Sequence, residues 1–180
     1  RHPQSAPQAL NGAAEYLAAR FAEYGWTPTR QAFPALGKSY VNIIAIKHPS
    51  GRVGRKRQAP LLVGAHYDTV IGSPGADDNA SALAVLLEAA DRLSQTVLTR
   101  PVWLAAFSLE EHGLLGSRAF IASLKQRGQP LEGTIVLECV GYASQEAGSQ
   151  RTPPGVPIPV PSVGNFLGVV GNEDSRHLVA

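Results

Sequence analysis

Strand-like apolar runs alternate with helix-like amphipathic runs through the middle of this chain, and this alternation most restricts its fold. Leu61–Ala65, Val102–Phe107 and Thr134–Leu137 are short apolar segments with the composition of strands. Between them, Asn79–Gln95 and Leu115–Arg127 carry apolar residues at helical spacing. Strands that alternate with helices of this length predict a largely parallel sheet covered on both faces.

The N-terminal part adds one helix and two strands to this pattern. Apolar residues from Leu10 to Phe21 recur at helical spacing, and the helix is expected to end near Gly25. Thr29–Phe33 and Tyr40–Lys47 are predicted strands, which we expect to form an antiparallel hairpin at the sheet edge. The predicted fold class is therefore α/β, a three-layer sandwich with a mixed, mostly parallel central sheet.

The composition changes after Val140. Residues 144–162 are rich in Pro, Gly and Ser and predict a long loop with polyproline character. Residues 165–170 are expected to begin another strand. With 180 residues, of which 44% are hydrophobic, the chain fits a single domain over residues 1–180.

Charge and composition argue against several classes of protein. A net charge of +2 is too small to indicate a nucleic-acid partner, and the basic run Arg52–Arg57 is expected to be a solvated hairpin loop. No apolar run is long enough for a membrane segment. The single cysteine, Cys139, excludes an internal disulfide and is expected to be a buried thiol on a strand. Because methionine is absent, we expect that the native N-terminus has been lost.

Candidate metal ligands follow the predicted strands. His66, Glu110, Glu111 and Glu138 each come just after an apolar strand, and Asp78 lies where the next helix is expected to begin. In an open α/β sheet, ligands bind at the carboxyl ends of the strands, so these side chains should converge. Imidazole and carboxylate groups gathered in this way suit a hydrolytic metal site.

Each of these residues also has a structural interpretation that stays open. His66 could be a core histidine, Asp78 a helix cap, and Glu110 and Glu111 surface carboxylates. Asp77 is expected to be a cap or turn residue instead of a ligand.

Four motifs in this order resemble those of co-catalytic di-zinc aminopeptidases, typified by secreted bacterial leucyl aminopeptidases. The motifs are GAHYDTV, PGADDNASA, LEEHGLLGS and LECVGY, and the resemblance runs roughly from Pro7 to Gly171. The wider superfamily includes glutaminyl cyclases, a glutamate carboxypeptidase and the transferrin-receptor ectodomain. The resemblance implies a sheet of the zinc-exopeptidase type and two zinc ions.

The resemblance also implies a role for each matching residue. His66 and Glu138 would bind one zinc ion, Glu111 would bind the other, and Asp78 would bridge both. At the position of Glu138 the family often has aspartate. The peptide bond after the bridging aspartate is often cis in the family, so Asp78–Asn79 is expected to be cis. In addition, Asp68 would orient the His66 ring.

Glu110 would be the general base beside a water molecule that bridges the metal ions. The expected substrates are peptides with a free N-terminus, and the expected location is secreted or periplasmic. The family's fifth ligand, a late histidine, has no match here, and His177 is only a weak candidate. We therefore expect a domain that is incomplete at its C-terminus, with weak or no activity as an isolated chain.

Two other functions stay open. A glutaminyl cyclase-like enzyme would need only one zinc ion, whereas the presence of both His66 and Glu138 favours two. A catalytically silent binding module, as in the receptor-like relatives, typically lacks metal ligands or the base, whereas Glu110 is present here.

Overall fold

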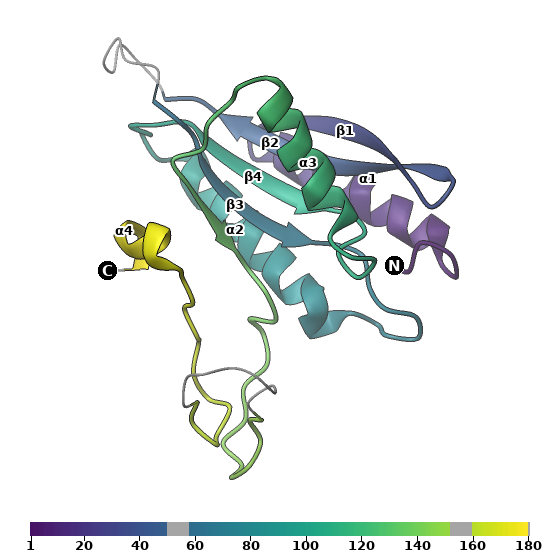
Figure 1. Cartoon of the computed structure of the whole chain (residues 1–180), viewed down its shortest axis with the longest axis vertical. Helices are drawn as coiled ribbons and strands as arrows, with labels where there is room; N and C mark the ends of the chain where they lie inside the picture. Colours follow the sequence, from purple (N-terminus) through teal and green to yellow (C-terminus); the bar gives the residue numbers. More distant parts are fainter. Residues whose placement is uncertain (50–57, 152–159, 180) are drawn as a thin grey trace. The chain divides into compact units, whose positions relative to one another are not determined.

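The computed structural model describes residues 1–49, 58–151 and 160–179, which divide into two compact units, residues 1–139 and 140–180. The first unit contains a five-stranded sheet with helices on both faces (Figure 1). The described part of the second unit contains two short helical segments, Glu173–Ser175 and α4 (Arg176–Val179). The assignment of all residues to one domain stays a prediction.

The strands of the sheet follow the order β1-β2-β4-β3-β5. Their bounds are β1 Thr27–Ala35, β2 Lys38–Lys47, β3 Leu61–His66, β4 Val102–Phe107 and β5 Gly133–Val136. β1 and β2 form an antiparallel hairpin and β2 is also antiparallel to β4, whereas β3 is parallel to both β4 and β5. This confirms the predicted mixed sheet with an antiparallel hairpin at its edge.

Helices form the two outer layers. α1 (Pro7–Glu23) and α2 (Ala82–Ser94) cover one face of the sheet, and α3 (Leu115–Gln126) covers the other (Figure 1). Each helix buries the apolar stripe that its periodicity predicts. Phe21 of α1 and Leu86 of α2 are fully buried, and Phe120 of α3 belongs to one cluster with Leu62 and Phe107 of the sheet. The three-layer architecture is therefore confirmed.

The helix after β3 begins later than its sequence pattern predicts. Regular helix starts at Ala82 instead of Asn79, because Asp78 (φ −97°, ψ 95°) and Asn79 (φ −132°, ψ 39°) have non-helical backbone angles. Residues 76–81 form a kinked turn instead. The residues that interrupt the helix are therefore a candidate ligand and its neighbour.

Two expectations for the later part of the chain are wrong. No strand forms over residues 165–170, where Val169 and Val170 are 72% and 84% exposed and so lack the packed face that favours a strand. Cys139 is exposed, because β5 ends at Val136 and the backbone turns at Cys139 with a φ of 47°.

Two further sequence calls fall largely outside the described residues. These are the basic run Arg52–Arg57 and most of the Pro-rich loop, while the described residues of 144–162 contain no helix or strand, as expected. None of the described helices is both long enough and apolar enough to cross a membrane.

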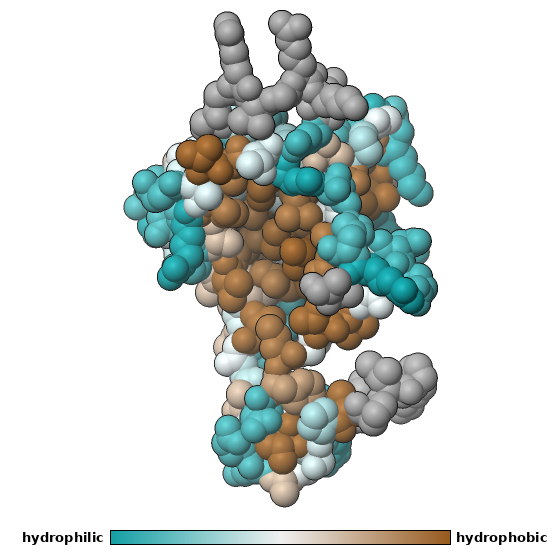
Figure 2. Space-filling model, turned by 90° about the vertical axis from the view of Figure 1, so that its left-hand side faces the viewer, coloured by the Kyte–Doolittle hydropathy of each residue, from teal (hydrophilic) through white to brown (hydrophobic). Residues whose placement is uncertain are grey.

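Apolar side chains gather on one face of the first unit, which Figure 2 shows in brown. β5 comes last in the sheet order, so one of its edges has no strand partner among the described residues. Its residues Ile135 and Val136 are 40% and 66% exposed. Of the three parallel strands that precede candidate ligands, β5 is therefore the least buried.

Candidate metal centre

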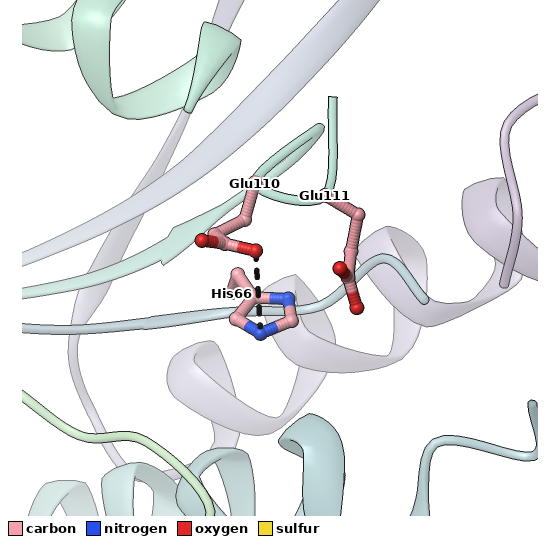
Figure 3. A group of neighbouring side chains, drawn as sticks. All are labelled: His66, Glu110 and Glu111. Atoms are coloured by element: carbon pink, nitrogen blue, oxygen red, sulfur yellow. Dashed lines mark ion pairs between the residues drawn. The ribbon is translucent and has the colours of Figure 1, made fainter. Parts of the chain in front are cut away.

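The candidate ligands lie together at one edge of the sheet. His66 ends β3, Glu110 and Glu111 follow β4, and Glu138 follows β5. Because these three strands are parallel, their carboxyl ends meet at the same edge. Figure 3 shows Glu110 and Glu111 reaching toward His66 from the loop after β4.

His66 is the centre of the cluster and is 4% exposed. Its Nε2 atom lies 3.0 Å from Asp78 Oδ1, 3.5 Å from Glu138 Oε2 and 3.9 Å from Glu110 Oε2. One imidazole nitrogen carries at most one proton, so it cannot hydrogen-bond well to three carboxylates at once. A cation that accepts several ligands suits this arrangement better.

Asp68 connects His66 to the loop after β4. Its side chain is completely buried, and its Oδ1 lies 3.5 Å from Nδ1 of His66. The same carboxylate accepts hydrogen bonds from the backbone N–H groups of Glu110 (2.9 Å) and Glu111 (3.2 Å). Asp68 thereby fixes the positions of a histidine and two glutamates relative to one another.

A tight turn presents Asp78 to His66. Gly75 has a φ of 68°, and a Cβ atom at this position would lie 2.2 Å from Thr69 Cγ2 and 2.8 Å from the backbone oxygen of Asp78. Glycine is therefore required for the turn to approach the end of β3. The Asp78–Asn79 peptide bond is cis, as the family resemblance predicts.

The N-terminal residue Arg1 also contacts this turn, a feature that the sequence did not suggest. Its guanidinium Nη2 donates a hydrogen bond to the Gly75 carbonyl (2.8 Å). Burial lowers the pKa of Arg1, and the nearby charges of Asp68 and Asp78 oppose that change. Arg1 therefore places a positive charge beside the carboxylate cluster.

The carboxylates change the pKa values at the centre. For His66, burial is the largest single influence and lowers the pKa, but the contact with Asp68 and the charges of Glu138, Asp68 and Glu110 together raise it to about 9. Burial raises the pKa of Glu110, an effect that the charge of His66 opposes and that of Glu138 reinforces. Burial and the charge of Asp78 raise the pKa of Glu111. The cluster thus favours added positive charge.

Two buried asparagines, neither predicted as a supporting residue, connect segments near the candidate ligands. Asn42 in β2 accepts a hydrogen bond from the backbone N–H of Ser108 (3.1 Å) and donates to the carbonyl of Gly116 (2.8 Å). Asn79 donates to the Glu138 carboxylate (3.0 Å). A lone polar residue in an apolar strand was the available signal for Asn42, whereas nothing in the sequence indicates which residues Asn79 contacts.

The side chains fit a metal ion in two overlapping groups. His66, Asp78 and Glu138 form one group, and His66, Glu110 and Glu111 form the other, with ligand atoms within 4.8 Å of one another in each. Glu111 Oε1 is buried and has no hydrogen-bond partner in the described part of the chain. Nitrogen and oxygen donors of this kind suit zinc. His177 lies in α4 of the second unit.

The chain is similar to several bacterial proteins. The Escherichia coli (strain K12) protein YfbL is 37% identical over 187 residues, which cover 94% of this chain and 55% of YfbL. A zinc aminopeptidase from Bacillus subtilis is 36% identical, with a TM-score of 0.53 over 64% of this chain and 28% of that one. The glutaminyl cyclase of Porphyromonas gingivalis is 26% identical, with a TM-score of 0.65 over 82% of this chain and 55% of that one.

The chain thus spans about half, or less, of the length of these relatives. The profile of peptidase family M28 matches residues 42–157, a range that includes every candidate ligand from His66 to Glu138. This match covers more than half of the chain and confirms the resemblance seen in the four motifs. The chain belongs to peptidase family M28.

Proposed function

We propose that this protein is a zinc-dependent aminopeptidase that releases N-terminal residues from peptides. The observation that carries the proposal is the convergence of three carboxylates on Nε2 of the buried His66 in a member of a peptidase family. The similarity to a zinc aminopeptidase of Bacillus subtilis supports the choice of metal and reaction.

In this proposal, His66, Asp78 and Glu138 hold one zinc ion. Glu111 would hold a second ion together with Asp78. The first assignment is supported by the proximity of the three ligand atoms, and the second by the buried Oε1 of Glu111, which has no hydrogen-bond partner in the described structure. Asp68 orients the imidazole of His66 and has no direct contact with metal in this scheme.

We assign the general base to Glu110. Zinc bound at this site would lower the pKa of water to about 7 and polarise the scissile carbonyl. Glu110 would accept a proton from the attacking water and return it to the leaving amine. Of the three carboxylates near Nε2 of His66, Glu110 lies farthest from that atom, at 3.9 Å. This longer distance suits a base better than a ligand.

The charge of the site supports a preference for peptide N-termini. Five acidic side chains lie in or beside the cluster: Asp68, Asp78, Glu110, Glu111 and Glu138. A free α-amine is cationic or binds metal, so a carboxylate-lined site attracts it more strongly than an internal peptide bond.

A second candidate is a glutaminyl cyclase-like activity. It is favoured by the alignment with the Porphyromonas gingivalis enzyme, which covers more of this chain than the alignment with the Bacillus subtilis aminopeptidase does. The two candidates differ in their reaction and in the number of zinc ions. Measuring the reaction and the zinc content of one preparation therefore distinguishes them.

The test uses the natural gene product, purified without chelator. We expect two zinc ions per chain by elemental analysis and hydrolysis of an aminoacyl anilide. Glu110→Gln should retain the zinc and lower the hydrolysis rate by about 100-fold or more. Cyclisation of an N-terminal glutaminyl peptide with one zinc ion and no anilide hydrolysis would favour the second candidate. A zinc-free, inactive protein would contradict both and indicate a binding module.

A further inference from the structure

Asn79 is buried, and both polar atoms of its side chain form hydrogen bonds with the segment that follows β5. Its Nδ2 atom donates hydrogen bonds to the Leu137 carbonyl (3.0 Å) and to Glu138 Oε2 (3.0 Å). Its Oδ1 atom accepts a hydrogen bond from the backbone N–H of Cys139 (3.3 Å). Asn79 itself is 0% exposed. Three consecutive residues are therefore held by one amide.

The side-chain amide of Asn79 continues the hydrogen bonding beyond the point where the pairing of β3 with β5 ends. The last backbone hydrogen bond between β3 and the β5 segment runs from the Leu137 N–H to the Gly64 carbonyl (2.9 Å). The next backbone groups, the Leu137 carbonyl and the Cys139 N–H, pair with Asn79 instead of a strand. An asparagine side chain offers both a donor and an acceptor, as a strand backbone does. Asn79 thus replaces a strand partner on both sides of Glu138.

The hydrogen bond to Glu138 also selects the direction of its carboxylate. The Oε2 atom that accepts from Asn79 is the oxygen that lies 3.5 Å from Nε2 of His66. Without this donor, a side chain that is 49% exposed has little else to hold it toward the histidine. The other oxygen, Oε1, accepts a weak hydrogen bond from the exposed Cys139 thiol (3.1 Å).

We propose that Asn79 is a positioning residue that holds Glu138 in place as a metal ligand. This inference rests on the proposed zinc site. Asn79 touches neither substrate nor metal in this scheme and acts through Glu138. Because Asn79 follows Asp78 directly, one dipeptide supplies a ligand and orients a second ligand of the same group.

The test measures zinc affinity, by competition with a chromogenic chelator, in the natural gene product. Asn79→Ala should weaken zinc binding at the site of His66, Asp78 and Glu138 by about 10- to 100-fold, the range for residues that orient a ligand. Asn42→Ala is the matched control. Asn42 is equally buried and makes three side-chain hydrogen bonds, none of them to a candidate ligand. This control should lose at least as much thermal stability and keep its zinc affinity at the site of His66, Asp78 and Glu138.

A double-mutant cycle with Glu138→Ala provides a readout that a purely structural role would not change. If Asn79 acts through Glu138, Asn79→Ala should not weaken zinc binding further once Glu138 is removed. Additive losses would overturn the proposal, as would unchanged affinity in Asn79→Ala. Failure of the wild-type protein to bind zinc would instead overturn the proposed function, together with this inference.

A measurement on the wild-type protein covers the case in which Asn79→Ala does not fold. The side-chain amide signals of Asn79, assigned by selective isotope labelling, should shift with the first equivalent of zinc. Signals that stay unchanged while zinc binds would overturn the proposal.

Discussion

Two carboxylates beside His66 are held in different ways. Asp68 is completely buried and accepts hydrogen bonds from two backbone N–H groups in the loop after β4. Glu138 is half exposed and depends on one side-chain amide, that of Asn79. We infer that the Asp68 side of the site contributes to folding stability, whereas the Glu138 side contributes mainly to metal binding.

The loop that carries Glu110 and Glu111 is also held more firmly than the loop that carries Glu138. The loop after β4 is fixed at both ends: Gly116, near the start of α3, donates a backbone hydrogen bond to Ser108 (3.0 Å), and Asn42 bonds to both residues. The loop that carries Glu138 instead follows β5, a strand at the edge of the sheet with exposed apolar residues. Substitutions in the first loop should therefore cost more stability than substitutions in the second.

The largest loss of stability is expected from Gly116→Ala. An added Cβ would lie 2.1 Å from the Ser108 carbonyl oxygen and 2.5 Å from Asn42 Oδ1, so backbone must move. We expect a loss of about 2–3 kcal/mol in the free energy of unfolding, measured by urea denaturation. Gly12→Ala, in an exposed position of α1 with open space around it, should instead stabilise by about 0.5–1 kcal/mol. Equal effects of the two substitutions would contradict the close packing at Gly116.

Asp68→Ala should have the next largest effect. It leaves the backbone N–H groups of Glu110 and Glu111 without their acceptor, at a cost of about 1–3 kcal/mol in the metal-free protein. Zinc affinity should also fall by about 10- to 100-fold, because the His66 ring loses its partner. A metal-free variant that melts at the wild-type temperature would show that Asp68 has no structural role.

Glu138→Ala separates metal binding from stability. Because the side chain is half exposed, the free energy of unfolding of the metal-free protein should change by no more than about 0.5 kcal/mol. Elemental analysis should nevertheless show one zinc ion fewer per chain. A loss of stability as large as that of Asp68→Ala would remove the contrast between the two sides of His66.

The smallest effect is expected from Cys139→Ser. The thiol is exposed, and a serine hydroxyl can donate to Glu138 in the same way. Both stability and zinc binding should change by no more than about 0.5 kcal/mol, measured by thermal unfolding and chelator competition. A loss of one zinc ion would instead make Cys139 a metal ligand.

Much of the fold is predictable from local patterns. Val102–Phe107 is a strand with the predicted bounds, and α3 begins at Leu115 as predicted. The sequence pattern gave wrong predictions where the local structure depends on contacts with residues far away in the sequence. Residues 165–170 have the composition of a strand but no packed face, and Asn79 continues a helical pattern that its backbone angles interrupt.

The sequence by itself determined which residues gather at the site. His66 ends one parallel strand and Glu110 and Glu138 follow two others, and parallel strands bring their carboxyl ends to one edge. Only the tertiary structure decided how these residues are held. Asn79 and Glu138 are 59 positions apart, and Asn42 and Ser108 are 66 apart. Hydrogen bonds between such distant residues have no local periodicity, so they follow from packing and cannot be read from the sequence pattern.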